Sequence, residues 1–288
     1  MSGETIRLMA LRNPIYLDLE QLIAQAEYHD VAVPRAEEIV ETSRSQRRAG
    51  AKLGLSGAGV DAGGEREVET QSTFRLEPQQ RSTVSKVIDR LHREQVISTA
   101  SSLTDRAIQK DDLVELDGIL RMTPTTLAGK LFYLMKKAIA SSDIASIDDL
   151  SIDDPEVEDV IRKVYLENEL LPIPILMQAV DTGMEVQVYV NINPSHFTTA
   201  DVADRLEGEH RVLGTVRSVI DGGDEGYYNA EEWLMPGWEY MIRRLMLTSL
   251  DDREIHSLFT QMGLKIPEGA TGTHVAGPAV LIDAIALY

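Results

Sequence analysis

Helical spacing of apolar residues is clearest in the N-terminal half of the chain. Apolar positions three and four apart predict two amphipathic helices there, one following Asp18 as N-cap and one beginning at Pro78. A third helix is predicted to open at Pro124. The predicted core faces are Leu19, Leu22, Ile23 and Ala26 in the first helix, Val84, Val87, Ile88 and Leu91 in the second, and Leu127, Leu131, Leu134, Met135 and Ala138 in the third.

The C-terminal third instead shows the alternation and the short apolar runs that are typical of strands. The predicted strands are Pro174–Val180, Met184–Ile192, Arg211–Ile220 and Gly277–Leu287. Residues 181–183 predict a hairpin turn between the first two strands, and Gly214 indicates a bulge in the third. The last run is apolar almost throughout, which favours a central position in the sheet.

This order of elements predicts the α+β class: a mixed or mostly antiparallel sheet with packed helices, plus a more helical N-terminal region containing a Gly-rich segment. We expect a mainly helical region over residues 1–142, with the Gly-rich segment at 50–64, and an α+β domain over 160–288. The acidic stretch 143–159 is interpreted as the connector between them. Within the first region, Leu113–Met122 predicts a strand pair or a bulged strand with an Asp-Gly turn inside it.

Composition narrows the class of protein. The chain has no cysteine, which excludes disulfides, thiolate metal ligands and cysteine nucleophiles, and fits a reducing cytoplasm. Its N-terminus lacks the basic start and apolar run of a signal peptide. No stretch reaches the roughly 18 uninterrupted apolar residues that a membrane-spanning helix needs. We therefore expect a cytoplasmic protein without a membrane span.

The net charge of −19 is concentrated in one part of the chain. Residues 1–110 carry 15 Lys/Arg and 16 Asp/Glu, whereas residues 111–288 carry 13 and 31. The C-terminal part should therefore repel nucleic acid and anionic lipid, so any polyanion contact has to come from the N-terminal part. The candidate partner-binding or polyanion-binding residues are Arg44, Arg47, Arg48, Lys52, Lys86 and Arg90.

The Gly-rich segment resembles a nucleotide-binding loop that lacks the required surroundings. Gly57, Gly59 and Ala62 match the dinucleotide-binding pattern. However, no buried strand precedes them and no amphipathic helix follows, so a pyrophosphate would meet no helix N-terminus. A flexible or partner-ordered loop is the favoured interpretation, with helix packing through small residues spaced by four as the alternative. No cofactor is expected.

Two further patterns leave an alternative open. Residues 83–97 resemble a winged-helix recognition helix leading into a wing, but no convincing first helix precedes them, so an ordinary amphipathic helix is favoured. Asp221, Glu225 and Glu232 follow the spacing of a calcium-binding loop. Because Gly223 supplies no ligand between the first two, an acidic turn is favoured over a metal site.

Histidines give little support for catalysis. The six histidines are scattered, and none forms the four-residue pairing of a metal site on a helix. His196, beside Ser195, is the candidate for a lone catalytic histidine, although a surface or capping role is favoured there. The sequence contains no catalytic motif that we can name.

Four short motifs follow one another along the chain: Ile15–Asp18 before a helix, the Gly-rich segment after a basic tract, Val212–Ile220, and the closing run Gly277–Tyr288. With these motifs, the chain resembles a family of bacterial proteins of unknown function. The resemblance implies a bacterial, cytosolic origin and brings no catalytic residues.

A well-patterned core without an assembled catalytic site favours a non-enzymatic cytosolic interaction or regulatory protein, whose partner is expected to be a protein. Two alternatives stay open. One is an enzyme or small-ligand-binding protein with a site assembled from distant residues. The other is a winged-helix-like DNA-binding regulator, with nucleic acid reached only through the N-terminal region.

Overall fold

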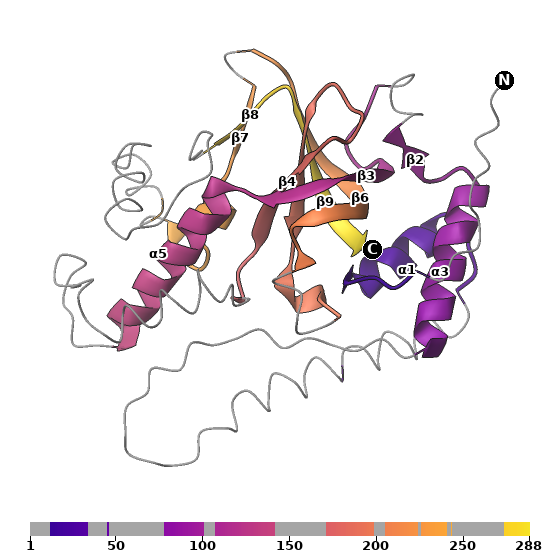
Figure 1. Ribbon diagram of the computed structural model, residues 1–288, viewed down its shortest axis with the longest axis horizontal. Coiled ribbons are helices and arrows are strands. Elements are labelled where there is room, and N and C mark those ends of the chain that lie inside the picture. Colours follow the sequence, from indigo (N-terminus) through magenta and orange to yellow (C-terminus); the bar gives the residue numbers. More distant parts are fainter. Residues whose placement is uncertain are drawn as a thin grey trace.

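The computed structural model describes residues 12–33, 45, 78–100, 107–141, 171–198, 205–223, 226–240, 243 and 274–288. Its elements are β1 (Tyr16–Leu17), α1 (Leu19–Tyr28), α3 (Pro78–Arg93), β2 (Ser98–Thr99), β3 (Leu113–Met122), α5 (Pro124–Ser141), β4 (Ile175–Val180), β5 (Gln187–Ile192), the 3₁₀ turn η2 (Pro194–His196), β6 (Gly208–Ile220), β7 (Tyr227–Asn229), α7 (Glu231–Leu234), β8 (His274–Ala276) and β9 (Ala279–Leu287). Figure 1 shows the longer strands at the centre, with α1 and α3 on one side and α5 on the other.

Five of the strands close into a small barrel. β3 pairs with β4, β4 with β5, β5 with β9, β9 with β6, and β6 returns to β3. Only the β5–β9 pair in this ring is parallel, so the sheet is mixed and mostly antiparallel. The long β6 closes the ring because its first part pairs with β3 and its later part with β9. Closure gives each of the five strands a partner on both sides.

The barrel interior is an apolar core built by strand alternation. In β5, for example, Val188, Val190 and Ile192 are completely buried in it, while the residues between them face outwards. The other residues of the five barrel strands in this core are Val114, Leu116, Leu120, Ile175, Met177, Ala179, Val212, Val216, Val280, Ile282, Ala284 and Leu287. Each large apolar side chain buried in this way contributes roughly 1.5–3 kcal/mol relative to an exposed one. The barrel is therefore the main source of hydrophobic stabilisation.

Two further apolar clusters cover separate parts of the outside of the barrel. The first packs α1 and α3 against strand residues that include Leu213 and Ile285. The second packs Trp233 of α7 and Val275 of β8 against strand residues that include Leu281. Leu281 and Ile285 both belong to β9, so Asp283 lies between two covered apolar patches. A polar band is left between them on the outer face of the barrel.

The three predicted helices are confirmed. Asp18 is the N-cap of α1, and its side chain accepts a hydrogen bond from the backbone N–H of Gln21 at 3.0 Å. All four residues of the predicted core face of α1 are buried, as are all four of α3. α3 and α5 begin at Pro78 and Pro124, where the fixed φ of proline suits the first turn of a helix.

The predicted strands of the C-terminal third are also present. β4 and β5 pair antiparallel as the hairpin prediction requires. The register of β6 against β9 shifts between Leu213 and Gly214, but the extra residue is Ile285 of β9, so the bulge predicted at Gly214 in this strand is wrong. A Cβ at Gly214 would lie only 2.4 Å from the backbone oxygen of Asp283, so glycine is needed there for the close approach of β9. β9 pairs with β1, β5 and β6, which gives it the predicted central position.

The predicted Asp-Gly turn within Leu113–Met122 is wrong. These residues form the single strand β3, whose pairing with β6 continues without a shift through Asp117 and Gly118. A Cβ at Gly118 would lie 3.0 Å from both the side chain of Thr182 and the backbone oxygen of Val180. The glycine therefore makes room for the end of β4 rather than for a turn.

The sheet contains strands from both of the regions that were predicted to be separate. β3, from the N-terminal region, pairs with β4 and β6, which come from the C-terminal one. The predicted boundaries at 142/143 and 159/160, like the Gly-rich segment 50–64, lie outside the described residues. The division into domains thus stays a prediction, while the sheet-rich core with packed helices is observed.

Candidate functional site

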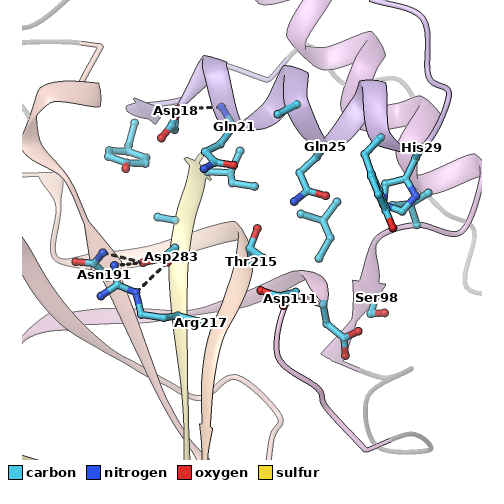
Figure 2. Close-up of a pocket in the computed structure, with 18 of the residues that line it drawn as sticks. Asp18, Gln21, Gln25, His29, Ser98, Asp111, Asn191, Thr215, Arg217 and Asp283 are labelled. Carbon is cyan, nitrogen blue, oxygen red and sulfur yellow. Dashed lines mark hydrogen bonds and ion pairs between the residues drawn. The ribbon is translucent and has the colours of Figure 1, made fainter. Parts of the chain in front are cut away.

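A groove of about 1000 Å³ runs between α1 and the outer face of the barrel. Its lining comes from α1, the residues after α3, the turn before β3, and strands β1, β2, β3, β5, β6 and β9. Figure 2 shows Gln21 and Gln25 extending from α1 towards the sheet, where Asn191, Asp283 and Arg217 lie on the opposite side. The groove thus occupies the polar band between the two outer apolar clusters.

One wall of the groove is the polar flank of α1. The Asp18 cap satisfies one of the free N–H groups at the start of this helix. Gln21 and Gln25 are four residues apart, so they lie on the same side of the helix. Tyr28, in the last turn, is 83% exposed and lines the same groove. This wall therefore offers two amide groups, each able to donate and accept, and an accessible aromatic ring.

Asp283 of β9 is at the centre of the groove floor. It is in register with Asn191 of β5 and Thr215 of β6. A second register shift in β6 leaves Arg217 as an extra residue in the strand, and bulges of this kind redirect a side chain. Arg217 contacts both carboxylate oxygens of Asp283, with Nε 2.9 Å from Oδ2 and Nη2 2.7 Å from Oδ1.

Trp233 of α7 fixes the orientation of Asn191. The indole Nε1 donates to Oδ1 of Asn191 at 2.8 Å, and because an indole N–H can only donate, the Asn191 amide nitrogen must point the other way. That nitrogen donates to Oδ1 of Asp283 at 2.8 Å. Gly129 of α5 lets α7 approach, since a Cβ there would lie 1.9 Å from the Trp233 carbonyl oxygen. We call Asn191, Arg217, Glu232, Trp233 and Asp283 the groove network.

One guanidinium serves two carboxylates in the groove network. Arg217 also pairs with Glu232, and its guanidinium lies 5.8 Å from the centre of the Trp233 ring. Burial raises the pKa of Glu232, and the nearby charge of Asp283 adds to this against the opposing effect of Arg217. Burial alone would lower the pKa of Arg217, but the two carboxylates outweigh it and raise that pKa. The remaining carboxylates in the lining are Asp18, Glu94, Asp111 and Asp112.

A second polar network lies beneath α3 and is largely closed to solvent. Arg12 donates to Oδ1 of Asp89 at 2.5 Å and lies over the ring of Tyr288 at 5.4 Å. Glu115 accepts a hydrogen bond from the Tyr288 hydroxyl, and its Oε2 lies 3.0 Å from Nε2 of His92. We call these five residues the buried network. It joins α3 to β3 and to the residue after β9, and none of its members lines the groove.

The buried network holds Glu115 as a carboxylate. Burial would raise the pKa of Glu115, but the hydrogen bonds with His92 and Tyr288 outweigh it, so the pKa is lowered. The pKa of the Tyr288 hydroxyl is raised, first by burial and then by the adjacent charge of Glu115. The hydroxyl therefore remains a donor to Glu115 at neutral pH.

His196 and Ser195 contact different neighbours. His196 Nε2 lies 3.6 Å from Oδ2 of Asp18, and its ring packs edge-on against Tyr16. The Ser195 hydroxyl donates instead to Oδ1 of Asn193 at 2.9 Å. These contacts tie η2 to the start of α1 at one end of the groove.

The predicted site residues that the structure describes do not gather at the groove. Lys86 and Arg90 lie one turn apart on the exposed side of α3, outside the groove lining. Asp221 is exposed after β6, while Glu232 pairs with Arg217. Outside the described residues lie Arg44, Arg47, Arg48, Lys52 and Glu225. The polyanion-binding role of the basic residues stays a prediction.

Sequence reasoning missed the centre of the groove network. The available signal was Asp283, the only charged residue in the otherwise apolar run Ala279–Leu287. A charge in a central strand needs a partner or a solvated opening. Its partner Arg217 is 66 residues away, which no local pattern can reveal.

The described residues limit two other roles. Among them, no group of three or more His, Asp and Glu residues is placed to hold a metal ion. No helix in the same part of the chain combines the length and the apolar character needed to cross a membrane.

Comparison with known proteins places the chain in a family. Residues 11–288 match the family described as "Domain of unknown function (DUF6414)", which spans the barrel, α1, α3 and the groove. No curated protein and no solved structure matches the chain. The prediction of an uncharacterised family is thereby confirmed, while a bacterial origin stays a prediction. Because the match covers nearly all of its length, the chain belongs to the DUF6414 family of proteins of unknown function.

Proposed function

We propose that this protein is a non-enzymatic interaction module that binds an extended segment of a partner polypeptide in the groove between α1 and the barrel. The observation that carries the proposal is the convergence of polar side chains on one groove from parts of the chain far apart in sequence, including Gln25, Asp111, Asn191, Arg217 and Asp283. In the sequence these residues show no common pattern.

The size and chemistry of the groove support a polypeptide as the occupant. Its volume of about 1000 Å³ is at the upper limit for small-molecule pockets. Amide side chains on the two sides, Gln21 and Gln25 facing Asn191, can donate to peptide carbonyls and accept from peptide N–H groups. Tyr28 adds an exposed aromatic ring, the kind of side chain that is enriched where proteins meet.

The arrangement of polar groups gives less support to catalysis. The Ser195 hydroxyl and His196 are held by different neighbours, so the sequence candidate for a catalytic histidine has no activated nucleophile in Ser195. Asp283 and Arg217 are paired with each other, an arrangement that orients a bound group rather than transferring a proton. A binding role in the cytoplasm is therefore proposed over an enzymatic one.

Selection from a library of random dodecapeptides displayed on phage tests the proposal. Wild-type protein should enrich related peptides. Ala24→Trp, which places an indole within the groove lining, should lower their affinity at least tenfold. The matched control is Glu27→Trp, on an exposed position of the same helix outside the lining, which should bind as the wild type does. Failure to enrich any peptide, or equal binding by both variants, would contradict the proposal.

A further inference from the structure

The groove floor contains one carboxylate that is held in a fixed orientation and still faces the groove. Asp283 accepts one hydrogen bond from Nε of Arg217 and one from Asn191, and Nη2 of Arg217 forms an ion-pair contact with its Oδ1. Asn191 is itself fixed by the fully buried Trp233. These three nitrogen contacts are themselves held in place by a bulge and by a buried indole, so the carboxylate has little freedom to turn. Asp283 nevertheless remains 41% exposed and lines the groove.

The hydrogen-bonding capacity of Asp283 is only partly used. Among the described residues, Oδ1 accepts a hydrogen bond from Asn191 and lies 2.7 Å from Nη2 of Arg217, whereas Oδ2 accepts from the Arg217 Nε alone. Each carboxylate oxygen can accept two hydrogen bonds. Oδ2 therefore has capacity for one more donor, and the exposed part of the side chain lies on the groove side.

Charge determines which kind of donor suits this position. Arg217 is shared by Asp283 and Glu232, and the charge of Arg243 also acts on Glu232. The groove lining among the described residues contains one arginine, Arg217, and five carboxylates, those of Asp18, Glu94, Asp111, Asp112 and Asp283. The groove therefore presents an excess of negative charge, with Asp283 at the centre of its floor. A charged donor makes a hydrogen bond to a carboxylate roughly twice as strong as a neutral one.

Building on the proposed function, we propose that Asp283 anchors a Lys or Arg side chain of the bound polypeptide segment. Arg217, Asn191 and Trp233 then act as positioning residues: they hold the carboxylate in place before the segment arrives, which lowers the entropic cost of binding. Asp117 of β3 is likewise paired with an arginine, Arg211, but lies outside the groove lining, which makes it the matched control.

The test uses the full chain and the same dodecapeptide library. Peptides enriched by the wild type should share one basic residue, and changing that residue to Met should weaken binding at least tenfold by calorimetry. Asp283→Asn should bind the basic and the Met peptides about equally. Asp117→Asn, which removes a carboxylate from Arg211, should keep the wild-type preference.

The outcomes separate this inference from the proposed function. Enriched peptides without a shared basic residue would overturn the role of Asp283 while leaving peptide binding in place. An equal loss of preference in Asp283→Asn and Asp117→Asn would overturn the anchoring role of Asp283. If no peptide is enriched from the library, both the proposed function and the role of Asp283 are contradicted. The comparison of the basic peptides with their Met counterparts uses only the wild-type protein. It therefore tests the preference for a basic residue even where Asp283→Asn folds poorly.

Discussion

The two polar networks use similar groups in different surroundings. Each joins an arginine to a carboxylate and lays the guanidinium over an aromatic ring. In the buried network, the Arg12 and Asp89 side chains are only 11% and 8% exposed, whereas Asp283 and Glu232 of the groove network are 41% and 43% exposed. The comparison indicates that the first network serves the fold, while the second combines a fixed geometry with access for a ligand.

The largest difference is expected when one carboxylate is removed from each network. Asp89→Ala leaves Arg12 buried without its partner and should lower the free energy of unfolding by about 3–5 kcal/mol. Glu232→Ala should change it by less than about 1 kcal/mol, because the ion pair of Glu232 with Arg217 is half-exposed. Urea denaturation measures both values. Equal losses would show that the groove network contributes as much to folding as the buried one.

A glycine substitution tests how far the groove network depends on close strand packing. Gly214→Ala places a Cβ 2.4 Å from the backbone oxygen of Asp283, and the strain should cost about 1–3 kcal/mol. It should also weaken peptide binding, because Asp283 has to shift. In the control Gly222→Ala, the new Cβ meets nothing closer than 3.5 Å, so both stability and binding should stay near the wild-type values. Thermal unfolding and calorimetry distinguish the two outcomes.

The pH dependence of stability should have opposite signs in the two networks, with effects on the order of 1 kcal/mol or less. The pKa of Glu115 is lowered in the folded state, so its contribution is present above the ordinary pKa of 4.5 and is lost as the pH falls below it. The pKa of Glu232 is raised, so stability falls as the pH rises through 4.5 and Glu232 ionises.

Urea titrations between pH 3 and pH 7 measure both carboxylates. Glu115→Gln should be less stable than the wild type at neutral pH, and the difference should shrink in acid. Glu232→Gln should gain on the wild type above pH 4.5, by a smaller amount because Glu232 is half-exposed. Parallel curves for the two variants would refute the assignment of opposite roles.

Much of the fold could be predicted from local sequence patterns. In these helices and strands, burial of one face determines the spacing of the apolar residues. The stripe of α1 follows directly from the spacing of Leu19, Leu22, Ile23 and Ala26, and the Asp18 cap marks its start. The apolar run of β9 indicated its central position for the same reason. The turn predicted at Gly118 was wrong, because an Asp-Gly pair in the sequence looks the same whether it permits a turn or makes room for the end of β4.

The groove could not be read in the same way, because its residues converge only when the barrel closes. Asn191 and Asp283 are paired by a parallel contact between β5 and β9, 92 residues apart. Arg217 reaches them through a bulge whose position depends on the register of two strands. The local signal was Asp283 itself, because a single charged residue in an apolar run needs a polar partner or solvent beside it.

The central position of β9 also has a consequence for the folding kinetics. Its pairings bring Leu287 beside Tyr16 and Asp283 beside Asn191, contacts of very high sequence separation. Such contacts form late and slowly, because a long loop must close before they give any stabilisation. Docking of this strand completes the barrel, joins both outer apolar clusters and delivers Asp283 to the groove in one step. Partly folded chains should therefore lack the proposed binding site altogether, so capture of the proposed partner segment would report on completed folding.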